Sequence, residues 1–182
     1  MKALPEFFTV ATEIPLHMMI KVIRSESTYQ STYITSDKFE REPYCNYFYL
    51  PPFQRKECWS KEQKKSYIES LFSNYCLMPL LVVESNGKEC DGWLIDGQQR
   101  MSAIRDFALD RLEIFEGITY SMLTTGDISY EDSTTRTPLN DFNGINIKIN
   151  VLREYGITEE LLKILYNKLN FGGTFHKENE LA

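Results

Sequence analysis

One short stretch limits the fold of this chain more than any other. Residues 79–84 (PLLVVE) are typical of a buried strand, and the dipeptide Asn86-Gly87 that follows is the strongest short signal for a hairpin turn. Residues 93–95 (WLI) are a second apolar run of strand length. The sequence therefore predicts an antiparallel hairpin, and we expect its second strand to be internal to the sheet.

Residues 96–100 (DGQQR) follow this second strand directly and precede a segment with helical spacing of apolar residues. A strand, a glycine-containing turn and a helix can bind phosphate, because the first N–H groups of a helix have no intrahelical partner and lie at its positive end. Gly97 allows a tight turn, and the guanidinium of Arg100 suits phosphate. The alternative is an ordinary strand-to-helix turn with polar surface residues.

Further patterns predict the elements around this hairpin. Residues 60–63 (SKEQ) have the form of a capping box, and the apolar positions after them recur with helical spacing. Residues 145–151 alternate apolar and polar side chains, as in a half-buried strand. Thr158 is placed to cap a final helix. The predicted core face of that helix is Leu161, Leu162, Ile164, Leu165 and Leu169. Without strict βαβ alternation, these patterns predict an α+β fold with a small mixed sheet and packed helices.

Four motifs occur in order along the chain: residues 51–55 (PPFQR) with Trp59 after them, a helix leading to Pro79, residues 95–100 (IDGQQR) and residues 169–173 (LNFGG). With these motifs the chain resembles the N-terminal domain family of GmrSD-type, modification-dependent restriction systems, in the ParB/sulfiredoxin-like superfamily. The resemblance runs from about Leu50 to the C-terminus. It implies a ParB/sulfiredoxin-like nucleotide-binding domain at residues 45–182, with residues 1–44 as an extension that packs on the core.

The resemblance also implies that the DGQQR turn binds a nucleoside triphosphate, which several relatives hydrolyse. The candidate catalytic residues are then Asp96, Gln98, Gln99 and Arg100. The candidate nucleotide-binding residues are Gln54, Arg55, Gly97, Asn170, Gly172 and Gly173.

The chemistry of these side chains fits such roles. Arg100 would neutralise charge that develops on a transferred phosphoryl group. Gln98 or Gln99 would orient the attacking water, because an amide both donates and accepts hydrogen bonds. Asp96 would be a ligand of Mg²⁺ or a partner of Arg55.

The residues near the C-terminus and Trp59 each allow two interpretations. Asn170, Gly172 and Gly173 either close the same pocket or form a plain C-terminal cap of the last helix. Trp59 either stacks on a base or belongs to the hydrophobic core.

The charge of the chain favours a small anion over long DNA. The formal net charge is −6, although residues 51–66 hold five basic residues against two acidic ones. Residues 106–141 hold eight acidic residues against two basic ones. Because duplex DNA is usually held by a broad basic face, we expect weak or no duplex binding by this chain alone.

Composition places the chain among globular proteins. No apolar run reaches the length of a membrane span, and the N-terminus has no secretion signal, so we expect a cytoplasmic protein of a bacterial or phage-infected cell. The four cysteines have no metal-site spacing and are expected to be reduced.

Three functions remain open. The first is a nucleoside-triphosphate-binding domain, with Mg²⁺ and slow hydrolysis, that acts in DNA metabolism or in the conflict between phage and host. The second is a non-catalytic module that binds a protein partner, such as a multidomain relative. The third is a ParB-like DNA-binding protein. The chain contains no complete nuclease motif, so we expect a stand-alone minimal domain or a fragment.

Overall fold

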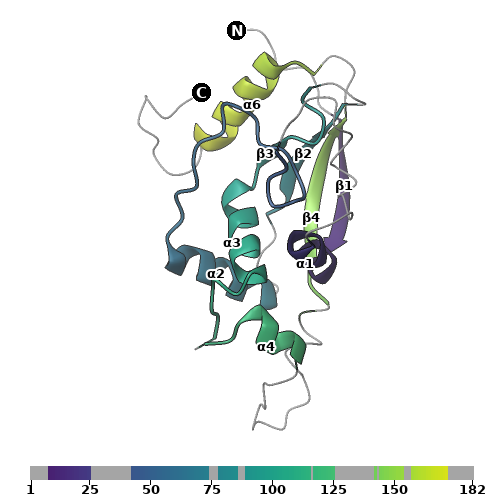
Figure 1. Cartoon of the computed structure of the whole chain (residues 1–182). Helices are drawn as coiled ribbons and strands as arrows, with labels where there is room; N and C mark the ends of the chain where they lie inside the picture. The colour runs from purple at the N-terminus through teal and green to yellow at the C-terminus, as the bar shows by residue number, and fades with distance from the viewer. Residues whose placement is uncertain are drawn as a thin grey trace.

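The structure is a computed structural model, and it describes residues 8–25, 42–73, 78–85, 89–115, 117–125, 142, 144–153 and 157–171. Its elements, in chain order, are β1 (Phe8–Pro15), α1 (Leu16–Arg24), α2 (Lys61–Phe72), β2 (Leu80–Glu84), β3 (Leu94–Asp96), α3 (Gln98–Ala108), α4 (Tyr120–Thr125), β4 (Asn146–Arg153) and α6 (Glu159–Phe171). Figure 1 shows the helices gathered around one sheet. The predicted α+β class is confirmed.

The sheet is mixed, with the strand order β1-β4-β2-β3. β1 runs antiparallel to β4, β4 runs parallel to β2, and β2 runs antiparallel to β3. Leu81 lies opposite Asp96 and Val82 lies opposite Leu94, with an irregularity between the two pairs. The predicted pairing of these two segments is therefore confirmed, whereas the turn signal Asn86-Gly87 lies outside the described residues.

The prediction of an internal second strand is wrong, because β3 is at the edge of the sheet. The main chain at Tyr49 covers this edge: its N–H donates to the carbonyl of Gly92 (2.9 Å), and its carbonyl accepts from the N–H of Leu94 (2.8 Å). Leu94 and Ile95 are fully buried, each in a hydrophobic cluster. The apolar run does not distinguish the two positions, because a covered edge strand and an internal strand need the same side chains.

The N-terminal residues, which precede the first of the four motifs, also contribute to this sheet. β1 pairs with β4 along its whole length, from Phe8 opposite Arg153 to Pro15 opposite Asn146. α1 follows without a break. Its buried residues recur at helical spacing and are Leu16, Met19, Ile20 and Ile23.

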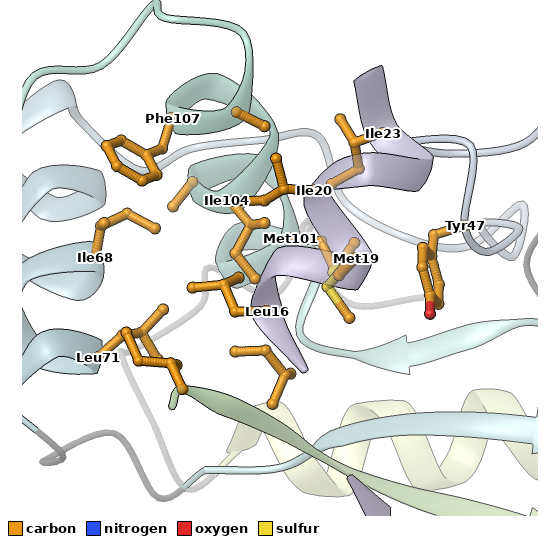
Figure 2. Close-up of a cluster of buried hydrophobic side chains, with 14 of the residues drawn as sticks. Leu16, Met19, Ile20, Ile23, Tyr47, Ile68, Leu71, Met101, Ile104 and Phe107 are labelled. Carbon is orange, nitrogen blue, oxygen red and sulfur yellow. The ribbon is translucent and has the colours of Figure 1, made fainter. Parts of the chain in front are cut away.

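The main core lies among three helices and the sheet. Figure 2 shows side chains of α1, α2 and α3 pointing toward one another. Those labelled on α2 and α3 are Ile68, Leu71, Met101, Ile104 and Phe107. Fully burying one such side chain contributes about 1.5–3 kcal/mol, so this cluster fixes α3 firmly relative to the sheet.

The start of α2 matches its prediction. Ser60 Oγ accepts a hydrogen bond from the backbone N–H of Gln63 (3.3 Å), and the side-chain oxygen of Gln63 accepts one from the N–H of Ser60 (2.8 Å). These reciprocal bonds satisfy two backbone donors that the first helical turn leaves unpaired. The capping box is therefore confirmed.

The final helix is also confirmed, but its predicted core face is partly wrong. Thr158 Oγ1 accepts from the N–H of Leu161 (3.3 Å), as expected for a cap. Ile164 and Leu169 are 49% and 46% exposed, however, and Tyr166 takes a buried place beside Leu162. The reason is the position of α6 at one end of the sheet, near β3, where only a narrow helix face meets the core (Figure 1).

Within the part of the chain that the structure describes, no helix combines the length and the apolar character that a membrane crossing requires.

Candidate functional site

Three segments that are distant in the sequence line one cavity of about 360 Å³. They are residues 54–59 before α2, the turn from β3 into α3, and the C-terminal part of α6. All candidate residues in the described ranges lie in its lining. These are Gln54, Arg55, Asp96, Gly97, Gln98, Gln99, Arg100 and Asn170. Gly172 and Gly173 lie outside the described residues.

Gly97 makes the turn at the base of the cavity possible. It has φ +111° and stands immediately before α3, where it is the N-cap residue. A Cβ at this position would overlap the Leu80 side chain, and L side chains rarely adopt such a φ. Because no side chain of the described residues caps α3, its first backbone N–H groups are available, within that part of the chain, at the positive end of the helix.

Arg100 lies in the first turn of α3 and is only 8% exposed. Its Nη1 donates to the carbonyl oxygens of Met78 (2.7 Å) and Pro79 (2.8 Å), and its Nη2 donates to Oδ2 of Asp96 (2.5 Å). The guanidinium therefore connects the approach to β2 with the end of β3. A contact between Arg100 and phosphate stays a prediction, to which the geometry adds a structural role.

The two neighbouring glutamines have different environments, although both are 7% exposed. Gln99 Oε1 accepts from the N–H groups of Cys58 (2.9 Å) and Trp59 (3.1 Å), and its Nε2 donates to the carbonyl of Lys56 (3.3 Å). The side-chain amide of Gln98 has no hydrogen-bond partner among the described residues. Of the two, Gln98 is the one whose amide is available to a ligand or water in the cavity.

Residues 54 and 55 are attached to both β3 and α6. Gln54 Nε2 donates to the carbonyl of Leu94 (3.4 Å), and the N–H of Arg55 donates to the hydroxyl of Tyr166 (3.4 Å). Gln54 Oε1 is buried without a partner in the described part of the chain. Asn170 Nδ2 donates to the carbonyl of Tyr166 (2.8 Å), so this residue both bonds its own helix and lines the cavity.

Trp59 supports both of its interpretations. Its ring packs against Tyr67 of α2 with a centroid distance of 5.6 Å, at the periphery of the main core. The same residue is partly exposed and lines the cavity. It can therefore offer an aromatic surface to a ligand while its other contacts hold it in place.

Glu57, in the middle of the 54–59 segment, was not among the candidates. Arg105, Tyr44 and Lys64 all donate to its carboxylate. Burial alone would raise the pKa of Glu57, but the hydrogen bonds from Arg105 and Tyr44 outweigh that effect and lower the pKa to about 2. The sequence offers no local signal for this group, since its members are spread from residue 44 to residue 105.

The basic segment before and within α2 is less positive than its composition suggests. Lys64 is 9% exposed and forms ion pairs with Glu57 and Asp106, and Lys65 pairs with Glu69. The basic side chains that line the cavity among the described residues are those of Arg55 and Arg100. This local character suits a small anion better than the long backbone of DNA.

The described residues do not form a metal cage. None of them belongs to a group of three or more His, Cys, Asp or Glu side chains placed to hold an ion. The cavity lining contains one carboxylate, that of Asp96, which is paired with Arg100. Mg²⁺ commonly binds through one or two carboxylates together with substrate phosphates, and only that mode fits here.

One comparison with known proteins gives a result. The model of the family described as GmrSD restriction endonuclease, N-terminal domain, matches residues 32–181, which leaves β1 and α1 before the matched region. No curated protein and no solved structure matches the chain. Membership of the ParB/sulfiredoxin-like superfamily stays a prediction. With more than four fifths of its length matched, the chain belongs to the family of GmrSD restriction endonuclease N-terminal domains.

Proposed function

We propose that the cavity binds a nucleoside triphosphate and that the chain acts in a restriction-related process of phage defence. The observation that carries the proposal is the convergence of three distant segments on the uncapped start of α3. A second observation supports it independently: Gln54 Oε1, in the cavity lining, is buried without a hydrogen-bond partner among the described residues. Such a group favours a polar ligand.

The charge distribution suits the phosphates. The first N–H groups of α3 lie at the positive end of the helix, and Gly97 lets a ligand approach the backbone closely. The lining also holds two arginines, Arg55 and Arg100, against one carboxylate. Arg55 then contributes the second phosphate contact, and Arg100 acts mainly by holding the turn.

The remaining lining suits a base and a sugar. Trp59, Ile95 and Leu169 contribute apolar surface beside the amides of Gln54, Gln98 and Asn170. Ligand cavities commonly combine an apolar wall with a few polar groups that fix orientation. Gln98 is the residue that would orient water if the bound triphosphate is hydrolysed, and Asp96 is the one lining residue that would reach a Mg²⁺ ion arriving with the phosphates.

The direct test is calorimetric titration of ATP, GTP, CTP and UTP, with and without Mg²⁺. We expect wild-type protein to bind at least one of them, and Gln98→Ala to bind it more weakly at an unchanged thermal midpoint. Lys148→Ala is the control, because this residue is exposed on β4 and does not line the cavity. Absence of binding by all four nucleotides to wild-type protein would overturn the proposal.

A second candidate function, a module that binds a protein partner, has one observation in its favour. Met78 and Leu169 are 68% and 46% exposed, and both line the cavity. Exposed apolar side chains that gather in one place are typical of interaction sites. If no nucleotide binds, co-purification with a multidomain family member, abolished by Met78→Glu or by Leu169→Glu, tests this function. A ParB-like DNA-binding role is opposed by the net charge, and a salt-dependent mobility shift tests it.

A further inference from the structure

We propose that Glu57 is a positioning residue of the cavity. Through its ion pair with Arg105 it fixes the 54–59 segment, and with this segment Arg55 and Trp59, in the position that the ligand requires. The effect on ligand binding rests on the proposed function. The effect on the segment itself does not, and it can be measured without any ligand.

The Glu57 carboxylate receives donors from three directions. Arg105 binds it with both ends of its fork, Nη1 to Oε1 at 2.7 Å and Nη2 to Oε2 at 3.0 Å. Tyr44 donates its hydroxyl to Oε1 (2.7 Å), and Lys64 Nζ approaches Oε2 (3.3 Å). Bidentate, charge-assisted pairs of this kind fix geometry as well as adding energy.

The donors are themselves anchored to the core of the molecule. Arg105 Nε and Nη2 both donate to Oδ1 of Asp106, and Lys64 Nζ donates to Oδ2 of the same carboxylate at 2.6 Å. Lys64 lies on α2 and Asp106 on α3, and both helices bury their other faces in the main core (Figure 2). Glu57 is therefore tied to a rigid part of the fold.

The segment that Glu57 belongs to needs such contacts. Residues 54–60 belong to no helix or strand, so no backbone ladder fixes them. Gln99 holds the backbone of Lys56, Cys58 and Trp59. Glu57 adds a side-chain attachment at the centre of the same stretch, two residues after Arg55 and two residues before Trp59.

Tyr44 is a further donor to Glu57 and lies close to the start of α3. Its hydroxyl lies 2.7 Å from Glu57 Oε1 and 3.3 Å from the backbone carbonyl of Gln98. A hydroxyl has one proton to donate, and the shorter distance assigns it to Glu57. The Gln98 carbonyl is then a close neighbour of the Tyr44 oxygen and not its hydrogen-bond partner, so Tyr44 holds the loop through Glu57.

The alternative is that these ion pairs only stabilise the fold. The two interpretations predict different accessibility of Trp59 and different ligand affinity when variants of equal thermal stability are compared. A positioning role requires Glu57→Gln to make Trp59 more accessible while the fold persists. A purely stabilising role predicts a lower thermal midpoint with no change at Trp59.

The experiment uses full-length protein with Glu57→Gln, Glu57→Asp and Arg105→Lys. Acrylamide quenching of tryptophan fluorescence reports on Trp59, because the other tryptophan, Trp93, is 3% exposed and contributes little. Two controls run in parallel. Glu84→Gln breaks the exposed Arg153–Glu84 pair, which lies outside the cavity lining, and Ile68→Val lowers stability from a fully buried position on α2.

We expect Glu57→Gln to increase quenching and to weaken binding of the nucleotide that wild type prefers by about tenfold, because Arg55 and Trp59 then have to be ordered on binding. Glu57→Asp, which keeps the charge, should recover part of both effects, and Arg105→Lys, which loses the fork, should resemble Glu57→Gln. The two controls should leave quenching and affinity at wild-type values.

The proposal is overturned if Glu57→Gln leaves quenching unchanged, or if Ile68→Val changes quenching and affinity as much at a matched thermal midpoint. If wild-type protein binds no nucleotide, the proposed function fails and the quenching comparison alone decides whether Glu57 positions the segment.

Discussion

Arg100 and Asp96 form an ion pair, Nη2 to Oδ2 at 2.5 Å, across the glycine at which β3 turns into α3. The same guanidinium holds the carbonyls of Met78 and Pro79, just before β2. The two charged residues of the DGQQR motif thus brace the turn that presents the start of α3 to the cavity.

Arg100→Ala should therefore destabilise the fold as well as change the site. It leaves two backbone carbonyls and one partly buried carboxylate without their donor, and losses of this kind cost about 1.5–3 kcal/mol each when the group stays buried. We expect a fall in the free energy of unfolding of at least about 2 kcal/mol, measured by urea denaturation. Arg105 variants, which leave this turn intact, provide the comparison. An unchanged free energy for Arg100→Ala would contradict the bracing role.

Gly97→Ala should be more damaging than the same change at Gly117. Both glycines have positive φ, +111° and +118°, so alanine is strained at either site by about 1–2 kcal/mol. Only at Gly97 would the added Cβ also overlap Leu80, whereas at Gly117 no atom of the described residues lies within 4 Å. Comparing the two variants by urea denaturation separates the clash from the strain. Equal losses would show that Leu80 moves aside at little cost.

Gln98→Ala and Gln99→Ala should have opposite signatures. Gln99 satisfies two N–H groups and one carbonyl of the 56–59 segment, so its truncation should lower the free energy of unfolding by about 1–3 kcal/mol. Gln98 lacks a side-chain partner among the described residues, so its truncation should change stability by less than about 0.5 kcal/mol. Parallel denaturation and nucleotide titration check both. A larger stability loss at Gln98 than at Gln99 would reverse the assignment.

Local signals predicted several elements of this fold correctly. The hairpin strands, the capping box at Ser60 and the cap at Thr158 each depend on residues within a few positions of one another. The family motifs also named eight described residues that line one cavity, although their chemical roles stay predictions.

Tertiary arrangement was harder to predict from the same sequence. The apolar run of α6 has the composition of a core helix, yet Ile164 and Leu169 are exposed because this helix packs at one end of the sheet. The strand order puts β3 at the edge of the sheet, and the residue that covers this edge, Tyr49, comes more than forty residues earlier. Glu57 is identified only by its hydrogen bonds from Tyr44 and Arg105, and no short sequence motif contains residues so far apart.

The Glu57 carboxylate also makes stability depend on pH in a defined window. Burial opposes its charged form, but hydrogen bonds from Arg105, Tyr44 and Lys64 outweigh burial and lower the folded-state pKa to about 2, from an ordinary 4.5. A depressed pKa means that the stabilisation is fully present above the unfolded-state pKa and is lost as pH falls from 4.5 through about 2. Glu57→Gln cannot titrate at this position.

The free energy of unfolding should therefore differ between wild type and Glu57→Gln by a constant amount above about pH 5.5, and the difference should shrink steadily below the ordinary pKa. Urea denaturation of both proteins at several pH values measures it. Other carboxylates, such as Asp110, whose pKa is also lowered, titrate in both proteins and cancel in the difference. A difference that stays constant down to about pH 3 would show that the Glu57 carboxylate is not held in its charged form by Arg105 and Tyr44.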